Sequence, residues 1–575
     1  MKLFKLRGGV HPESWKELAA ERAIRVLPMP ERLFVPLHQH VGAAAQPLVR
    51  VGEHVLKGQL IAASQGFISA AIHAPTSGVI TAIGDFSAAH PSGLTAPTVT
   101  ITSDGEDRWL ETRVLSDPFS LSPEEIAAAV GAAGIVGLGG ATFPSAVKLN
   151  LSRKNNVRTL IINGGECEPY ITCDDRLMRE RAAEIIEGVR LICYAVGAVE
   201  VMVGIEANKP AALAAMSAAA VGTEVKVVAV PAMYPMGWDK QMIRALTGRE
   251  VPADGRTADI GVLVHNVATA YAVRDAVRFG RPLVSRLVTV SGGAVAAPGN
   301  LEVPIGTLVE SLFEYCGGFS QKPARMVLGG PMMGIELFSA AVPVVKGTSG
   351  VLALTEREIG STRPAPCIRC SSCVRACPVG LLPLEMAAHI RSGNSGGAVS
   401  LGLKDCIACG CCSFVCPSHI PLVHYFSFAK GELMEQERGK LKQEATKKLA
   451  DERIARTERI AREREEAAAK RKAARAARER NKAAAVDELS CLVRSLPLPN
   501  PLPLAGEEAI EALRGSQVNE LAAKQAAGQT NGHGNDVTAD NEIHHARSPL
   551  SNFPPQAGER ANESLSEIQV KTEAA

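Results

Sequence analysis

The sequence predicts a multidomain protein of mixed α/β and α+β class. Three observations support this prediction. Short apolar stretches alternate with glycine turns between residues 33 and 102, as in a small β-domain. The middle of the chain repeats a strand, a polar loop and a helix, and two closely similar cysteine runs follow it. A length of 575 residues is typical of about four domains.

The composition is ordinary for a water-soluble protein, with 46% hydrophobic and 21% charged residues. A formal net charge of +2 gives no reason to expect nucleic-acid binding. We find no run of about 20 apolar residues, so no transmembrane helix is predicted. The N-terminal MKLFKLRGGVHPE lacks the apolar core of a secretory signal. We therefore expect a cytoplasmic protein, with a peripheral place on a membrane complex left open.

Residues 1–122 are expected to form the N-terminal domain. Glycines and prolines break residues 1–30 into an irregular lead-in. The segments LVRVGEHVLKGQLIAAS and AIHAPTSGVITAIG then each predict a strand, a turn and a strand. This pattern resembles the barrel-sandwich hybrid fold of lipoyl and biotinyl carriers. Those carriers need a lysine at the hairpin tip, and the tip SQGFISA has none, so a structural or docking module is favoured.

Residues 123–284 predict an α/β domain whose first helix begins at Pro123, with Ser122 as its N-cap. The segment GIVGLGGATFPSAVKL follows. Its glycines remove side chains where a backbone must approach a ligand closely; they are Gly137, Gly139 and Gly140. The helix that starts at SAVKL suits a phosphate, and Lys148 adds positive charge. The alternative is a tight turn without a ligand.

Two further segments place polar residues at the ends of predicted strands, where ligands bind in α/β sheets. In TLIINGGECEPYITCDDRLM, Asn163 can hydrogen-bond a flavin ring edge, and Glu166 and Glu168 can hold ribose hydroxyls or a nicotinamide amide. The alternative is a solvated acidic loop. In DIGVLVHNVATAYAVRDAV, a strand delivers His265, Asn266 and Thr269 to the start of a helix, which is a phosphate-site geometry.

Other parts of this domain give weaker signals. Glu206 and Lys209 can face a nucleotide or solvent, and solvent is favoured. The run PAMYPMGWDKQMIRALTG precedes a helix near Asp239 and is interpreted as a lid or a partner surface. Residues 285–345 predict strand, turn, strand and helix, and resemble the ubiquitin-like β-grasp module that binds soluble ligands. We expect this module to act as a spacer, with VLGGPMMGI as a packing turn.

The strongest signal is a pair of cysteine runs within residues 361–430, CIRCSSCVRACPVG and CIACGCCSFVCPSH. Each has the spacing C-x2-C-x2-C-x3-C followed by proline, which is the two-cluster ferredoxin pattern. In that pattern the fourth cysteine of each run ligates the other cluster. One [4Fe-4S] cluster is therefore assigned to Cys367, Cys370, Cys373 and Cys416. The other is assigned to Cys406, Cys409, Cys412 and Cys377.

A zinc site or disulfides are the alternatives for these cysteines, but zinc sites usually pair two short cysteine motifs across a longer loop. Cys411 falls outside the ligand spacing and is expected to pack. A helix is predicted at 381–393 between the two runs.

Residues 431–488 are almost entirely Ala, Lys, Arg and Glu and predict a solvated single helix. Its basic part KRKAARAARER can instead contact acidic lipid or a partner. Residues 489–575 contain LPLPNPLPL and a polar tail, and they are predicted to be disordered.

The motifs GLGGATFPSAVK, NGGECEP and HNVATAYAV resemble, in the same order, three motifs of the NADH-oxidising flavoprotein subunit of respiratory complex I. With the double ferredoxin pattern, residues 1–430 are similar to the RnfC/RsxC family, which belongs to the Rnf (Rsx) electron-transport complex. The resemblance implies NADH near Phe143, Glu166 and Glu168. It implies FMN near Gly137, Gly139, Gly140, Lys148, Asn163, Asn266 and Thr269. The sequence departs from the family pattern at Leu138, Gly164, Gly165, Cys167 and His265.

We therefore expect an electron-input subunit with FMN and two [4Fe-4S] clusters, without a catalytic acid or base of its own. The resemblance implies NADH as substrate, ferredoxin as electron partner, and membrane subunits that couple the reaction to ion translocation. It implies a peripheral position on the cytoplasmic face of the bacterial inner membrane. Two other hypotheses stay open: a non-catalytic iron–sulfur wire with a degenerate flavin pocket, and a diaphorase subunit of a soluble dehydrogenase or hydrogenase.

Overall fold

The structure is a computed structural model that describes residues 3–90, 92–253, 255–360 and 363–495. The chain divides into two compact units, Met1–Glu452 and Arg453–Ala575. All the predicted domains up to the cysteine runs lie in the first unit. None of the described helices combines the length and the apolar character that a membrane span needs.

The N-terminal domain contains two antiparallel sheets, as the strand and turn pattern predicted. The four-stranded sheet has the order β2 (Arg32–Pro36), β8 (Thr95–Ser103), β7 (Gly78–Ser87) and β4 (His54–Val55). The three-stranded sheet has the order β3 (Gln46–Pro47), β5 (Leu60–Ala63) and β6 (Ile72–His73). Alternate residues such as Val35, Ile61 and Ile101 face inward and are fully buried.

Gly78, at the start of β7, has a φ of +154°, and a Cβ there would lie 2.1 Å from the carbonyl oxygen of Thr102. The two strands approach so closely at this point that only glycine fits.

The α/β domain is built on a fully parallel sheet with strand order β11-β10-β9-β12. The strands are β9 (Thr159–Gly164), β10 (Glu200–Glu206), β11 (Lys226–Val230) and β12 (Val262–Asn266). Its helices are α1 (Pro123–Ala132), α2 (Ser145–Lys154), α3 (Cys173–Glu180), α4 (Ala182–Val196), α5 (Pro210–Ala219), α6 (Asp239–Thr247) and α7 (Val267–Phe279). The central strands β9 and β10 are largely apolar and buried, as is usual for a parallel sheet that helices cover on both faces.

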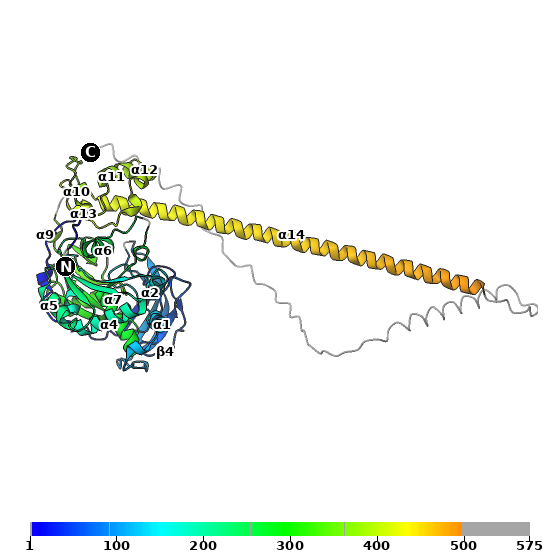
Figure 1. The fold of residues 1–575 in the computed structure, drawn as a ribbon, viewed down its shortest axis with the longest axis horizontal. Coiled ribbons are helices and arrows are strands. Elements are labelled where there is room, and N and C mark those ends of the chain that lie inside the picture. Colours follow the sequence, from blue (N-terminus) through cyan, green and yellow to red (C-terminus); the bar gives the residue numbers. More distant parts are fainter. Residues whose placement is uncertain (1–2, 91, 254, 361–362, 496–575) are drawn as a thin grey trace, which may run out of the picture. The chain divides into compact units, whose positions relative to one another are not determined.

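Local sequence signals explain how this domain begins and how its helices pack. Ser122 caps α1, as the sequence predicted, by accepting from the backbone N–H of Glu125. The Glu125 carboxylate accepts in return from the N–H of Ser122, which completes a capping box. Helices α4 and α7 pack side by side (Figure 1). Gly188 of α4 permits this packing, because a Cβ there would lie 1.9 Å from the carbonyl oxygen of Ala270.

The module after the α/β domain is a six-stranded mixed sheet with order β1-β14-β13-β17-β15-β16. The strands are β1 (Arg25–Val26), β13 (Ser285–Ser291), β14 (Gly299–Pro304), β15 (Arg325–Leu328), β16 (Ile335–Leu337) and β17 (Gly350–Leu354), with helices α8 (Val309–Tyr315) and α9 (Glu356–Ile359). Strand β1 comes from residues 1–30 and pairs in parallel with β14. The lead-in is therefore not wholly irregular: it supplies an edge strand and a short 3-10 helix, Lys16–Leu18.

A buried lysine joins three parts of this unit. Lys346, before β17, is 1% exposed, and its Nζ donates to the carbonyl oxygens of Ala71 (2.6 Å) and Gly134 (2.7 Å). Ala71 precedes β6, and Gly134 follows α1. Burial lowers the pKa of Lys346 from 10.5 to about 7. The amine thus connects the N-terminal domain to the α/β domain.

The cysteine-rich part is made of short helices around a small apolar core. They are α10 (Ser372–Ala376), α11 (Pro383–Arg391), α12 (Ser395–Ser400) and α13 (Cys411–Phe414). Helix α11 confirms the helix predicted between the two runs, and α12 was not predicted.

The charged segment forms one long helix, α14 (Leu422–Arg494), drawn in yellow to orange in Figure 1. It begins at Leu422, ahead of the predicted start at residue 431, because Leu422, Phe426 and Ala429 pack into the core of the cysteine-rich part. It also continues past residue 488, so the predicted disordered tail is wrong for residues 489–494. The rest of that tail, 496–575, lies outside the described residues.

Candidate functional site

The three segments singled out by the sequence meet at the carboxyl edge of the parallel sheet. Asn266 and Asn163 are register partners on the adjacent strands β12 and β9. The Nδ2 of Asn266 donates to Asp174 Oδ2 at 2.6 Å and to the carbonyl oxygen of Asn163 at 3.5 Å. Gly139 lies against the same side chain, since a Cβ there would come within 3.2 Å of the Asn266 Cβ. The strand-end prediction is therefore correct in placing these residues at one edge.

A buried threonine, Thr269, accepts a hydrogen bond from the backbone of the glycine loop. The backbone N–H of Leu138 donates to Thr269 Oγ1 at 2.9 Å, and Thr269 is fully buried. The loop closes on itself where Gly137 N–H donates to the Phe143 carbonyl oxygen at 2.9 Å. Gly139 and Gly140 remain exposed, and a Cβ at Gly140 would meet no other atom. The loop therefore presents bare backbone outward, which suits close approach by a phosphate or a ring.

Two of the polar residues predicted to bind FMN, Lys148 and Asn163, instead form hydrogen bonds with other residues of the protein. Lys148 Nζ donates to the Val264 carbonyl oxygen at 3.2 Å, and burial lowers its pKa. Asn163 Nδ2 donates to the Gly237 carbonyl oxygen at 2.8 Å, while its Oδ1 accepts from Gly165 N–H at 2.9 Å. In the described structure both side chains therefore stabilise the carboxyl edge of the sheet by hydrogen bonds within the protein.

Glu166 is buried and Glu168 is half-buried, so the interpretation of their loop as a solvated acidic loop is wrong. The Glu166 carboxylate accepts from the backbone N–H groups of Asp174 (2.8 Å) and Asp175 (3.4 Å) at the start of α3. Burial is the main cause that raises the pKa of Glu166 to about 7, and Lys16 at 4.0 Å opposes the rise.

The prediction that Glu206 and Lys209 face solvent is also wrong. Both are 2% exposed and form an ion pair beneath the acidic loop. Lys209 Nζ also donates to the Glu166 carbonyl oxygen at 3.2 Å. A charged pair is tolerated there because each group has partners that offset its loss of hydration.

Sequence reasoning missed Lys16 entirely. This residue of the lead-in donates from Nζ to the Glu168 carbonyl oxygen at 2.9 Å and to the Ile171 carbonyl oxygen. Burial lowers its pKa, although Glu166 favours the charged form. No local pattern marks a single lysine in an irregular segment, so only the fold reveals its role.

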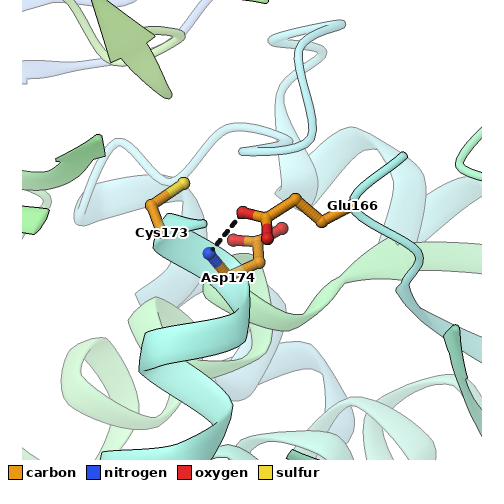
Figure 2. A group of neighbouring side chains, drawn as sticks. All are labelled: Glu166, Cys173 and Asp174. Atoms are coloured by element: carbon orange, nitrogen blue, oxygen red, sulfur yellow. Dashed lines mark hydrogen bonds between the residues drawn. The ribbon is translucent and has the colours of Figure 1, made fainter. Parts of the chain in front are cut away.

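Glu166, Cys173 and Asp174 form a cluster whose ligand-type atoms lie within 4.8 Å of one another (Figure 2). The dashed line in Figure 2 is the hydrogen bond from Asp174 N–H to Glu166. Asp174 already accepts from Asn266, and the buried cations Lys16 and Arg286 add positive charge nearby. This is the chemistry of a helix N-terminus capped by carboxylates, and we interpret the cluster in that way.

Two buried polar atoms at this edge lack a hydrogen-bond partner among the described residues: Glu168 Oε1 and His265 Nε2. The other carboxylate oxygen of Glu168 accepts from Met332 N–H at 3.0 Å, and burial raises the pKa of Glu168 to about 7. Burial lowers the pKa of His265 to about 3, so its ring is neutral. Buried polar atoms are rarely left unpaired in a complete site, and these two are therefore suited to a polar ligand.

Phe143 is half-buried within the glycine loop. No hydrogen bond or ring stacking joins it to Glu166 or Glu168 within the described residues. Phe143 lies on the glycine loop before α2, whereas Glu166 and Glu168 lie on the loop that follows β9.

The eight cysteines line two separate apolar cavities, and the division follows the crossed assignment. One cavity is lined by Cys377, Cys406, Cys409 and Cys412, with Cys411 beside them. The other is lined by Cys367, Cys370, Cys373 and Cys416. Backbone N–H groups point at the sulfurs of Cys367 (3.4 Å, from Arg369), Cys406 (3.4 Å, from Ala408) and Cys377 (3.3 Å, from Leu381). Such donors stabilise iron-bound thiolates, so the residues fit two [4Fe-4S] clusters.

The two cysteine loops differ in exposure. Cys377, Cys409 and Cys412 are buried, whereas Cys367 and Cys370 are exposed. Cys411 is fully buried, as expected for a packing residue.

A glycine loop with exposed backbone at the carboxyl edge of a parallel sheet, together with two four-cysteine cavities, is typical of iron–sulfur flavoproteins of the electron-transfer class. Four family models match the chain. They are the RnfC barrel sandwich hybrid domain (residues 4–106), the Nuo51 FMN-binding domain (130–275), the SLBB domain (287–336) and the 4Fe-4S dicluster domain (366–420).

The chain belongs to the RnfC family of ion-translocating oxidoreductase complex subunits. It is 53% identical over 436 residues to the RnfC relative of Rhodobacter capsulatus, covering 76% of this chain and 84% of the relative. It is 44% identical over 453 residues to the Pseudomonas aeruginosa relative, covering 79% and 58%. A Clostridium ljungdahlii relative, 44% identical over 382 residues (66% and 83%), is named as a subunit of a proton-translocating ferredoxin:NAD(+) oxidoreductase complex.

We expect Thr269→Val to weaken the glycine loop. The change keeps the side-chain shape but leaves the buried Leu138 N–H without its acceptor, which costs about 1–3 kcal/mol. The free energy of unfolding and the ratio of flavin to protein should both fall. Thr269→Ser keeps the hydroxyl and is the control: it should retain flavin at close to the wild-type ratio. Equal flavin loss in the two variants would contradict a role for the hydroxyl.

Glu168 should make the protein less stable as pH rises. Its folded pKa of about 7 lies above the ordinary value of 4.5, so its stabilising contribution is complete below pH 4.5 and is lost as pH rises through 7. The loss amounts to about 3 kcal/mol. Denaturant unfolding between pH 4.5 and 8 should show a shallower decline for Glu168→Gln than for the wild type. Glu310→Gln, at an exposed position on α8, is the control and should keep the wild-type slope.

Proposed function

We propose that this chain is the electron-input subunit of an Rnf-type complex and passes electrons between NADH and two [4Fe-4S] clusters by way of FMN. The observation that carries the proposal is the presence, within one compact unit, of a glycine loop with exposed backbone at the carboxyl edge of a parallel sheet and of two four-cysteine cavities. The matches to the Nuo51 FMN-binding domain and the 4Fe-4S dicluster domain support it. If bound, FMN would supply the conversion between the two-electron hydride of NADH and the single electrons that iron–sulfur clusters carry.

The residues of this chain bind and orient the groups. We assign the exposed backbone of Gly139 and Gly140 to the flavin phosphate side of the pocket, with Asn266 at the strand edge. We assign Glu168 to the nicotinamide nucleotide, since its buried Oε1 is unpaired among the described residues and can accept from a ligand N–H or hydroxyl. Thr269, Lys148 and Asn163 support these groups from within the protein.

The cluster ligands are assigned as the two crossed sets of cysteines given above. The domain boundaries we propose are 1–122, 123–284, 285–345, 361–430, 431–488 and 489–575, and α14 crosses two of them.

We further propose ferredoxin and NAD(H) as redox partners, and other subunits of the complex as the route for ion translocation. The name of the Clostridium ljungdahlii relative supports ferredoxin and NAD+. A peripheral position on the cytoplasmic face of the inner membrane is consistent with the lack of a membrane span in the described helices.

An anaerobic titration tests the proposal. Purified chain with its FMN and clusters is mixed with NADH, and the flavin and iron–sulfur absorbance is followed. We expect both to bleach, and NAD+ as the matched control to bleach neither. If dithionite reduces the cofactors but NADH does not, the input role is wrong.

A further inference from the structure

The segment Ala232–Gly237 is part of the run PAMYPMGWDKQMIRALTG, which was interpreted from sequence as a lid or a partner surface, and it packs directly on the acidic loop. Asn163 Nδ2 donates to the Gly237 carbonyl oxygen at 2.8 Å, and Gly237 N–H donates to Cys167 Sγ at 3.3 Å. A Cβ at Gly237 would lie only 2.5 Å from the Gly165 carbonyl oxygen. The segment is therefore packed against the acidic loop, and only glycine fits at position 237.

Tyr234 extends from this segment to the second cysteine loop. Its backbone pairs with Val10 in both directions, at 2.8 and 2.9 Å, and the residue is 2% exposed. Its hydroxyl donates to the carbonyl oxygen of Cys409 at 2.6 Å. A buried hydrogen bond of this length fixes the peptide that carries a cluster ligand.

A second set of contacts runs from the acidic loop to Gly410, the residue after Cys409. The Glu168 carboxylate accepts from Met332 N–H at 3.0 Å. The Met332 carbonyl oxygen lies against Gly410, where a Cβ would come within 2.9 Å of it. Two bridges that start from the acidic loop therefore end on the adjacent residues Cys409 and Gly410.

The first cysteine loop has no equivalent bridge among the described residues. Cys367 and Cys370 are exposed, and Ile368 between them is 67% exposed. Within the part of the chain that the structure describes, no side chain from the α/β domain donates a hydrogen bond to residues 367–373. The two cysteine loops are therefore similar in sequence, but they differ in their contacts with the α/β domain.

We propose that Tyr234 is a positioning residue for Cys409, and that it sets the reduction potential of one of the two clusters. The proposal rests on the cluster assignment of the proposed function, in which Cys409 belongs to the set with Cys377, Cys406 and Cys412. The hydroxyl dipole points its positive end at the ligand peptide and so favours the more negative, reduced cluster. Cluster potentials respond to hydrogen bonding and solvent exposure in this way.

The test is a redox titration of the cluster-loaded full chain with dithionite, followed by electron paramagnetic resonance. Cys406→Ala and Cys370→Ala each remove one cluster and so identify the signal of each loop. Tyr234→Phe is compared with Tyr271→Phe as a control. Tyr271 lies on α7, away from the cysteine loops, and its hydroxyl accepts a hydrogen bond from Arg181 at 2.9 Å.

We expect Tyr234→Phe to lower the potential of the Cys406–Cys412 loop cluster by about 59 mV, which is a tenfold change in its reduced-to-oxidised ratio. The other cluster and the Tyr271→Phe protein should be unchanged. If Tyr234→Phe loads iron poorly, selective loss of the Cys409-loop signal supports the proposal, and equal loss of both signals contradicts it. Unchanged potentials, or equal shifts in both clusters, also overturn it. Because dithionite supplies the electrons, the cluster potentials can be measured even if the protein does not oxidise NADH. A failure of the proposed function is therefore distinguishable from a failure of this inference.

Discussion

Replacing Cys377 by alanine is expected to remove the cluster of the second cysteine run, although Cys377 belongs to the first. In the structure Cys377 lines one cavity with Cys406, Cys409 and Cys412. Its sulfur accepts from Leu381 N–H at 3.3 Å, as an iron-bound thiolate would. With one ligand lost, we expect iron and sulfide per chain to fall by about half.

Cys373→Ala is the matched control, because Cys373 lies in the same run but lines the other cavity. The paramagnetic spectrum of reduced Cys377→Ala should match that of Cys406→Ala, and the spectrum of Cys373→Ala should match that of Cys370→Ala. Cys411→Ala should keep both clusters. If Cys377→Ala and Cys373→Ala lost the same signal, each run would hold its own cluster and the crossed assignment would be wrong.

Lys346→Ala should strongly reduce the free energy of unfolding of the unit that contains the N-terminal and α/β domains. Removing the amine leaves the buried carbonyl oxygens of Ala71 and Gly134 without this donor, at about 1–3 kcal/mol each, and it opens a cavity. We expect a total of about 3–5 kcal/mol, measured as a lower denaturant midpoint. The packing between the N-terminal domain and the α/β domain should loosen with it.

Lys346→Met keeps most of the side-chain volume and is the control. It should be less destabilised than the alanine variant, and it should alter the pH dependence. The folded pKa of Lys346, about 7, lies below its ordinary value of 10.5, so the folded protein releases the proton first. Wild-type stability should therefore gain from this group as pH rises from 7 to 10.5. A methionine variant that kept this gain would show that another group titrates.

Elements with local signals were predictable from the sequence. The Ser122 capping box, the strands that end at Asn163 and Asn266, and the helix between the cysteine runs each depend on residues close together in the chain. The cysteine spacing was predictable for the same reason, since three ligands of each set lie on one short loop.

Features that depend on long-range packing were not predictable. Lys16 reaches the acidic loop, and Tyr234 reaches Cys409, across more than a hundred residues of sequence. The pair Glu206 and Lys209 looks like a solvated surface in sequence, but the parallel sheet buries it. The early start of α14 depends on Leu422 and Phe426 packing into the cysteine-rich core, and Gly431 does not break the helix because a helical glycine costs only about 1 kcal/mol.

A cofactor inventory of the anaerobically purified full chain tests the account most directly. One polypeptide that combines a flavin pocket with two crossed cysteine cavities should contain about one FMN, eight iron and eight acid-labile sulfide per chain. Zinc in place of iron, or full iron without any flavin released by acid, would contradict it.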